Sequence, residues 1–237
     1  MSGRKKQKRI DEARAMANII EAKDENAKEK LRGFFDSDKA NAPPLILPLE
    51  KGETANSTKI ILELGCGSGD YTINLAKKYP TTKFVGVDIQ GERLWLGATQ
   101  ANKEKLDNVI FLRTQIENLA DFVPPRSVDE IWLTFPDPFP TKKKIKKRLT
   151  SERFLKIYSL ILKSSGILHL KTDNKNLFDY SADSIANFGG QILVCGQVEN
   201  LIQKNPDLVI NTYFETKHRA LGDAIYYLQA TLPCQPK

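Results

Sequence analysis

Residues 62–70 read Leu-Glu-Leu-Gly-Cys-Gly-Ser-Gly-Asp, with glycine at positions 65, 67 and 69. An apolar stretch, KIILELG at 59–65, leads into these glycines, and DYTINLAKKYP at 70–80 follows them with helical spacing. Glycine is needed where a backbone turns sharply or approaches a ligand without a Cβ in the way. The stretch therefore predicts a buried strand, a tight turn and a helix. Taken alone, it fits a generic strand-to-helix turn as well as a ligand-binding one.

Strand-like and helix-like segments alternate after this turn. We expect further strands at 83–89, 108–113, 128–136, 166–172, 190–198 and 224–232, and helices at 92–106, 150–163 and 176–188. Alternation at this spacing predicts an α/β fold with a Rossmann-like, seven-stranded, mostly parallel sheet and helices on both faces. A long polar loop instead of a helix separates the last two strands, which predicts an antiparallel strand at the sheet edge.

The beginning of the chain differs from the rest. Residues 11–32 lack Gly and Pro and carry apolar residues at helical spacing, which predicts a helix. Residues 41–58 contain three prolines and several small polar residues, which is typical of a linker. We therefore divide the chain into a basic, partly helical N-terminal arm and linker, 1–58, and one larger domain, 59–237.

The composition is that of an ordinary globular protein. Of the 237 residues, 41% are hydrophobic and 27% are charged. The 36 Lys and Arg exceed the 29 Asp and Glu, so the net charge is +7, which favours an anionic partner such as nucleic acid or a membrane surface. No apolar run approaches the ~18 residues that span a bilayer. The basic N-terminus leads into no long apolar core, so we expect no secretory signal.

Cysteine and histidine are scarce. The chain has three widely spaced cysteines, no C-x-x-C pair and two histidines. A disulfide scaffold is therefore not expected, and a reducing, cytoplasmic location is the simplest one. A zinc site lacks its usual ligands, so we expect no metal. A Ser-His-Asp hydrolase is disfavoured because the chain contains no G-x-S-x-G.

Two acids accompany the glycine turn. Asp88 ends the second strand, about 20 residues past the glycines, where an acid can hydrogen-bond ribose hydroxyls. Glu63 stands just before the glycines and faces the same crevice. The spacing departs from the dinucleotide pattern G-x-G-x-x-G because position 70 is Asp70, and this disfavours a dehydrogenase. A solvent-facing strand end is the alternative for Asp88.

The E-x-G-x-G-x-G arrangement with a second acid after the next strand resembles the class I S-adenosylmethionine-dependent methyltransferases. The resemblance implies that Gly65 and Gly67 pass the amino-acid and sugar part of S-adenosylmethionine, and that Asp88 holds its ribose. This cofactor has no pyrophosphate, so the helix N-terminus need not cradle a phosphate. Its ammonium and sulfonium groups attract carboxylates such as Glu63.

The stretch after the fourth strand reads FPDPFPTKKKIKKR at 135–148. Its three prolines in five residues predict a stiff, extended loop that holds Asp137 in one place. Because the fourth strand lies beside the first in this topology, the loop faces the same crevice. Six cations follow in seven residues, from Lys142 to Arg148. Such a run fits a solvated face, but its place beside the crevice favours nucleic acid.

This stretch resembles the F-P-D-P-[WF]-P element and the basic run of the tRNA (guanine-N7-)-methyltransferase family, the TrmB type. Residues 212–215, Thr-Tyr-Phe-Glu, match the family's T-x-[FY]-E element, and a basic segment with Leu-Gly follows at 217–222. The match covers residues 59–230. It implies transfer of a methyl group from S-adenosylmethionine to N7 of a variable-loop guanosine in tRNA. We expect tRNA as partner, no membrane, and no obligatory protein partner.

The resemblance also implies a role for each matching residue. Asp137 falls at the catalytic position, and Gln115 falls where the family has an acid or amide that reaches adenine. Cofactor contacts are expected at Glu63, Gly65, Gly67, Asp88, Gln115 and Asp137. Contacts with tRNA are expected at Thr141, Lys142, Asp173, Thr212, Tyr213, Phe214 and Glu215. The sequence departs from the family pattern at Phe139, where Trp is commoner, and at Thr141, where Lys is usual.

The chemistry of N7 fits these residues. N7 has a free lone pair and no proton, so its attack on a sulfonium methyl needs no general base. A fixed carboxylate, Asp137 or Glu215, would stabilise the guanine ring as positive charge develops on it. N7 is inaccessible in an A-form helix, so the target lies in a loop or a distorted region. Phe135, Phe139 and Tyr213 are candidates for stacking the base, with ordinary packing as the alternative.

Two other functions stay open. F-P-D-P loosely resembles the D-P-P-[YF] element of enzymes that methylate an exocyclic amine, so another class I RNA or DNA methyltransferase is one alternative. A non-catalytic RNA-binding protein on the methyltransferase scaffold is the other, and the intact Glu63, Gly65, Gly67 and Asp88 argue against it.

Overall fold

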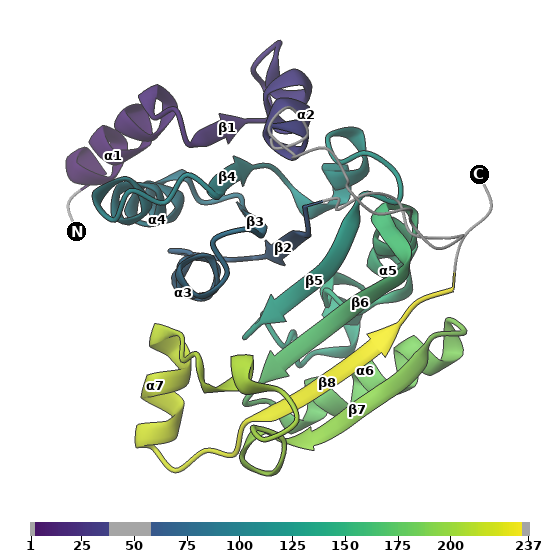
Figure 1. Cartoon of the computed structure of the whole chain (residues 1–237). Coiled ribbons are helices and arrows are strands. Elements are labelled where there is room, and N and C mark those ends of the chain that lie inside the picture. Colours follow the sequence, from purple (N-terminus) through teal and green to yellow (C-terminus); the bar gives the residue numbers. More distant parts are fainter. Residues whose placement is uncertain (1–2, 38–57, 234–237) are drawn as a thin grey trace, which may run out of the picture.

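A twisted sheet of eight strands crosses the molecule in the computed structural model, which describes residues 3–37 and 58–233 (Figure 1). The strands are β1 (Ile19–Glu21), β2 (Ile60–Leu64), β3 (Lys83–Asp88), β4 (Val109–Arg113), β5 (Val128–Thr134), β6 (Leu162–Thr172), β7 (Gln191–Gln197) and β8 (Tyr226–Thr231). Their order is β1-β4-β3-β2-β5-β6-β8-β7. Neighbours from β1 to β6 are parallel, and β8 is antiparallel to both β6 and β7. The predicted Rossmann-like sheet with an antiparallel strand near one edge is confirmed.

Helices cover both faces of this sheet. They are α1 (Gly3–Ala15), α2 (Ala27–Asp36), α3 (Asp70–Lys78), α4 (Gly91–Lys103), α5 (Glu152–Ile161), α6 (Lys175–Asn187) and α7 (Tyr213–Ala220). Short 3-10 helices are η1 (Ile116–Asp121), η2 (Lys142–Lys147), η3 (Val198–Asn200) and η4 (Pro206–Val209). One apolar core joins α2, α5 and α6 to the sheet, and the other joins α1, α3 and α4 to its opposite face.

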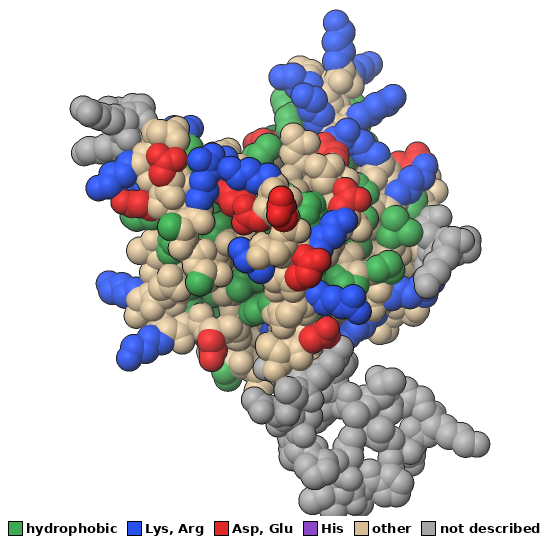
Figure 2. All heavy atoms as spheres, turned by 90° about the horizontal axis from the view of Figure 1, so that it is seen from above, with side chains coloured by type: hydrophobic (Ala, Val, Ile, Leu, Met, Phe, Trp, Pro, Cys, Tyr) green, Lys and Arg blue, Asp and Glu red, His purple; other side chains and the backbone are tan. Residues whose placement is uncertain are grey.

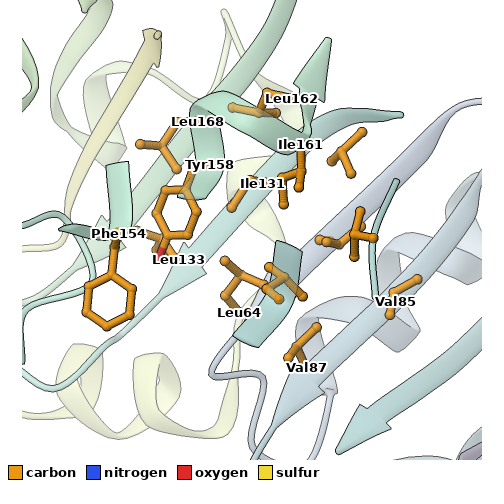
Figure 3. Packing of buried hydrophobic residues seen from close by; sticks show 14 of the residues in the cluster. Leu64, Val85, Val87, Ile131, Leu133, Phe154, Tyr158, Ile161, Leu162 and Leu168 are labelled. Carbon is orange, nitrogen blue, oxygen red and sulfur yellow. The ribbon is translucent and has the colours of Figure 1, made fainter. Parts of the chain in front are cut away.

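Alternation along β2 divides its side chains between the two cores. Leu62 and Leu64 lie in the first core, whereas Ile61 lies in the second. Figure 3 shows Leu64 in the first core together with Phe154 and Tyr158 of α5. A strand that is buried on both faces reads as a continuous apolar run, which is why the sequence pattern predicted β2.

The N-terminal segment differs from the prediction of one helix over 11–32, which is wrong. α1 ends at Ala15, β1 follows as an edge strand, and α2 begins at Ala27. β1 forms because it pairs with β4 and because Arg113 binds the buried Glu21, with Nη1 3.1 Å from Oε1. This strand raises the count from the predicted seven to eight. Of the predicted linker 41–58, all but residue 58 lies outside the described residues, and the domain division stays a prediction.

α1 lies along α4, whose N-terminal part borders the glycine turn (Figure 1). Lys6 pairs with Glu92 at 3.3 Å, and the Arg9 guanidinium lies 4.9 Å from the ring centre of Trp95. The face seen in Figure 2 carries many Lys and Arg side chains with Asp and Glu among them. Exposed charge alone therefore does not identify an RNA-binding surface. The Lys and Arg side chains that are candidates for binding RNA are those that lie beside the cavity.

The sequence predicted a long polar loop between β7 and β8. The structure differs, because this segment contains η3, η4 and α7. Thr212 caps α7, since its Oγ1 accepts a hydrogen bond of 3.1 Å from the Glu215 amide. Glu215 is the buried residue of this short helix. A helix that buries no apolar side chain leaves no periodic signal in the sequence.

Phe111 of β4 sets how closely the glycine turn, β3 and α4 approach each other. A Cβ at Gly69, Gly86 or Gly97 would lie 2.5 to 2.8 Å from the Phe111 ring. A Cβ at Gly97 would also lie 2.5 Å from the Ser68 carbonyl oxygen. Such distances are too short for any side chain, so these glycines allow the ring and the turn to pack.

Candidate active site

A cavity of about 800 Å³ opens at the carboxyl ends of the central strands. Five short segments contribute much of its wall, namely residues 65–68, 88–90, 114–117, 134–137 and 212–214, and residues of α4, η2 and α5 also line it. Ligands of open α/β sheets bind at this edge. The residues predicted to contact the cofactor all line it, namely Glu63, Gly65, Gly67, Asp88, Gln115 and Asp137. The structure brings these residues together, and their binding role stays a prediction.

The glycine turn adopts a conformation that few other residues accept. Gly65, Gly67 and Gly69 have φ of +74°, +57° and +71°, in the left-handed region. The Gly65 and Cys66 amides both donate to the Val87 carbonyl, at 2.8 and 3.1 Å. The three glycines are therefore required by the backbone itself, and the turn is tied to β3.

Asp88 joins two walls of the cavity. Its Oδ2 accepts a hydrogen bond of 2.9 Å from the Gly67 amide, and its Oδ1 accepts one of 2.8 Å from the Gln90 amide. Each carboxylate oxygen has two lone pairs, so acceptor capacity remains for hydroxyl groups of a ligand. Asp88 thus shapes the turn and can also bind what enters it.

Glu63 is buried at the floor of the cavity. Its Oε2 accepts hydrogen bonds from the amide of Thr72 (2.9 Å) and from its hydroxyl, and its Oε1 accepts one of 2.5 Å from Thr134 Oγ1. Burial raises the pKa of Glu63 from 4.5 to about 7, against the lowering effect of these hydrogen bonds. A cation bound nearby would favour the charged carboxylate.

The loop after β5 is bent, where the sequence predicted an extended one. Phe135 and Phe139 have φ of +50° and +39°, and each precedes a proline. A bulky residue at positive φ is strained, and such strain persists only where the surroundings fix it. Asp137 lies between the two bends, exposed at the cavity. Within the described part of the chain, no hydrogen bond or ion pair engages its carboxylate.

The basic run forms η2 and its end, next to this loop. The lysines at 142–144, 146 and 147 are exposed, and Lys147 lines the cavity. Arg148, which the sequence grouped with them, is instead buried and donates to the Pro138 carbonyl at 2.8 Å. We call the five lysines the lysine rim.

The start of α7 forms another part of the cavity wall. Thr212, Tyr213 and Phe214 all line the cavity, and the two aromatic side chains are 71% and 47% exposed. The Tyr213 amide donates to Asp70 Oδ2 at 3.2 Å, which ties α7 to the glycine turn. Exposed aromatic rings beside a cavity are suited to stacking a base.

Glu215 does not reach the cavity. Its side chain is fully buried and binds Lys171 Nζ at 2.6 Å and an Arg219 guanidinium nitrogen at 2.9 Å. The sequence-based expectation that Glu215 contacts tRNA or the guanine ring disagrees with this placement, because its oxygens face protein cations.

The other predicted tRNA contacts lie outside the cavity walls. Asp173 lies 3.5 Å from His218 Nδ1, just after β6. Thr141 and Lys142 are exposed at the start of η2. Their contact with tRNA stays a prediction.

Sequence reasoning missed several residues of the cavity wall, among them Ile89, Arg93 and Leu96. Ile89 and Leu96 expose apolar side chains there, and Arg93 lies next to Gly67. Ile89 directly follows Asp88, which the sequence placed at the crevice, so its place in the sequence could have identified it as part of the wall. Apolar side chains in the wall that also contains Gln115 suit a planar heterocycle.

Two absences concern only residues 3–37 and 58–233. No group of three or more His, Cys, Asp or Glu side chains in these ranges is arranged to hold a metal ion. No helix in these ranges is long and apolar enough to cross a membrane.

Known proteins are similar to this chain in sequence and in fold. A family model described as a putative methyltransferase matches residues 57–228. The tRNA (guanine-N(7)-)-methyltransferase of Christiangramia forsetii is 42% identical over 176 residues, which cover 73% of this chain and 79% of that protein. The protein of the same name from Porphyromonas gingivalis is 42% identical, over 73% of this chain and 71% of that one.

Solved structures agree with the architecture at low sequence identity. The 16S rRNA methyltransferase KamB has a TM-score of 0.56 at 16% identity and covers 73% of this chain and 87% of its own. A SAM-dependent methyltransferase from Aquifex aeolicus has a TM-score of 0.53 at 16% identity, over 74% and 82% of the two chains. These structures show the fold, and the sequence relatives show the family. The chain belongs to the tRNA (guanine-N(7)-)-methyltransferase family.

Proposed function

We propose that this protein transfers a methyl group from S-adenosylmethionine to N7 of a variable-loop guanosine in tRNA. One observation carries the proposal: a single cavity joins the glycine turn and Asp88 to the Asp137 loop, the aromatic start of α7 and Lys147 of the lysine rim. Its relatives carry the name of this activity. Cytoplasmic location, independence from metal and action without a protein partner belong to the same proposal and rest on the sequence.

The cavity fits S-adenosylmethionine in size and chemistry. Its volume of about 800 Å³ lies within the ~300–1,000 Å³ of small-molecule sites. We assign the ribose to Asp88, adenine to the surface formed by Ile89 and Gln115, and the amino-acid part to the turn at Gly65 and Gly67. S-adenosylmethionine supplies an electrophilic methyl group on a positively charged sulfur.

The residues of this chain then have to orient guanine and stabilise its charge. N7 carries a lone pair and no proton, so no side chain has to remove one. Asp137 accepts hydrogen bonds from the guanine N1–H and amino groups and stabilises the positive charge that develops on the ring. Its carboxylate is available because no described group of the protein binds it. The rest of the rate enhancement comes from holding N7 in line with the methyl group.

The tRNA is held by groups at the mouth of the cavity. Tyr213 and Phe214 present exposed rings for stacking an unpaired base. The lysine rim attracts phosphates and releases counterions from the RNA. A target in a loop is required, because the deep groove of A-form RNA hides N7.

Nucleoside analysis tests the proposal. Purified protein is incubated with methyl-labelled S-adenosylmethionine and an unmodified tRNA transcript, and the digested RNA is separated into nucleosides. We expect label in N7-methylguanosine and none when the variable-loop guanosine is replaced by adenosine. Label in N6-methyladenosine would indicate an amine methyltransferase. Tight binding of tRNA without transfer would indicate a non-catalytic RNA-binding protein.

A further inference from the structure

Arg148 ends the basic run but does not share the surroundings of the lysines before it. It is 6% exposed, whereas the five lysines of the rim are exposed to solvent. Its backbone amide closes η2 with a hydrogen bond of 3.0 Å to the Ile145 carbonyl. This turn directs the Arg148 side chain back to the loop that carries Asp137.

The guanidinium of Arg148 binds two successive carbonyls of that loop. Nε donates to the Pro138 carbonyl at 2.8 Å, and Nη2 donates to the Phe139 carbonyl at 3.4 Å. The guanidinium also lies over the ring of Tyr180 in α6, 4.5 Å from its centre. The planar group is thus held between α6 and the loop, with its donors fixed in direction.

The loop needs a donor from outside because it has few backbone N–H groups with which to form its own hydrogen bonds. Pro136, Pro138 and Pro140 have no N–H group, so three of five residues cannot donate to a backbone partner. Phe139 has a φ of +39°, a conformation that persists only when its surroundings fix it. The two carbonyls that Arg148 binds lie before and after the N–Cα bond of Phe139, and rotation about this bond is the angle φ. The bent conformation and the two hydrogen bonds therefore depend on each other.

We propose that Arg148 is a positioning residue for methyl transfer, which fixes the Asp137 carboxylate and the Phe139 ring at the cavity by binding the carbonyls of Pro138 and Phe139. Asp137 is bonded directly to Pro138, so a change at that carbonyl moves the carboxylate. Catalysis by placement is sensitive to displacements of about 1 Å. This inference rests on the proposed function, because it assigns Arg148 a part in that reaction.

The inference separates Arg148 from the cations that bind RNA. A cation that contacts phosphate contributes to the salt dependence of RNA binding, with a slope of about 0.7 to 0.9 per contact. A buried guanidinium that binds carbonyls contributes to kcat and leaves this slope unchanged. The basic run therefore divides into two parts, a lysine rim that holds tRNA and one arginine that shapes the active site.

The test compares Arg148→Lys with Lys144→Ala, an exposed cation of the same run, and with Lys156→Ala on the outer surface of α5. Single-turnover rates at saturating tRNA, the salt dependence of tRNA binding, cofactor affinity and thermal unfolding are measured for each. We expect Arg148→Lys to lower the single-turnover rate at least tenfold with an unchanged salt slope, because one ammonium cannot reproduce two planar donors. Lys144→Ala is expected to reduce the salt slope. Lys156→Ala is expected to behave as wild type.

Two results would overturn the inference: a wild-type rate in folded Arg148→Lys, or a salt slope reduced as in Lys144→Ala. Should Arg148→Lys fail to fold, Tyr180→Leu takes its place, since it removes the ring beneath the guanidinium and leaves both donors. Tyr180→Leu is then expected to lower the rate at an unchanged salt slope, and a wild-type rate would overturn the inference. A wild-type protein that does not methylate tRNA would contradict the proposed function instead.

Discussion

Lys171 and Glu215 form an ion pair in which neither side chain is exposed, with Nζ 2.6 Å from Oε2. Lys171 belongs to β6 and Glu215 to α7. The same ammonium donates to the carbonyls of Leu208 and Ile210, at 2.9 and 3.0 Å. One buried cation therefore joins the sheet to the segment that leads into α7, and it fixes where the aromatic start of that helix stands.

Replacing Lys171 by Met tests this connection. The change leaves the Glu215 carboxylate buried with one cation fewer and two carbonyls without their donor, so we expect the free energy of unfolding to fall by about 3 kcal/mol. Denaturant unfolding measures this loss. Adding Glu215→Leu should recover part of it in a double-mutant cycle. Additive effects of the two changes would show that the pair is not coupled.

Asp137→Asn tests the carboxylate at the cavity. Asp137 is exposed and engages no described group, so we expect unfolding to be unchanged within about 0.5 kcal/mol. Methyl transfer should fall on the order of 100-fold, because an amide cannot stabilise positive charge on guanine. The measurement is kcat with unmodified tRNA. Near wild-type turnover would remove Asp137 from the mechanism.

Neutralising Lys142, Lys143, Lys146 and Lys147 together tests the lysine rim. All four are exposed, so folding should be unaffected. If each contacts a phosphate, the slope of log affinity against log salt should decrease by about 3, at roughly 0.7 per contact. Filter binding or fluorescence anisotropy between low and physiological salt gives the slope. An unchanged slope would mean that the rim is only solvated.

The pH dependence of stability tests the burial of Glu63. Its pKa is raised from 4.5 to about 7, so the folded protein holds this proton more tightly than the unfolded chain does. The resulting stability is present below about pH 4.5 and is lost as the pH rises through about 7. The loss is about 3 kcal/mol, at about 1.4 kcal/mol per pKa unit. Glu63→Gln stays neutral, so it should lack this loss.

The comparison is made between wild type and Glu63→Gln, as free energies of unfolding from pH 5.5 to 8. The difference between the two should change across this range, with wild type losing stability relative to the variant. A difference that is independent of pH would show that Glu63 titrates below the range and is not held neutral by burial.

Local signals predicted the glycine turn and Asp88 wall of the cavity well. The glycines at 65, 67 and 69 and the acid at the end of β3 lie within short stretches whose conformation their own residues dictate. The main strands and helices from 59 to 188 followed from periodicity for the same reason, although β6 begins at Leu162, within the segment predicted as helix 150–163. The cavity then formed where the topology places the ends of parallel strands.

What the sequence could not show depends on distant partners. β1 has three residues in a stretch with helical spacing, and it becomes a strand because β4 lies beside it some ninety positions later. Arg148 has the same charge as its neighbours, and only the bent loop explains why it is buried. Glu215 matches a family motif, yet Lys171 and Arg219 hold it inside. Charge and motif identify a residue's chemistry, and packing decides what it contacts.

A crystal structure of the protein with bound S-adenosylmethionine tests the central claim most directly. We predict the ribose at Asp88, the amino-acid part at the turn of Gly65 and Gly67, and the sulfonium methyl directed to the space beside Asp137. A ligand bound outside this cavity, or one whose methyl group faces away from the Asp137 loop, would contradict the account.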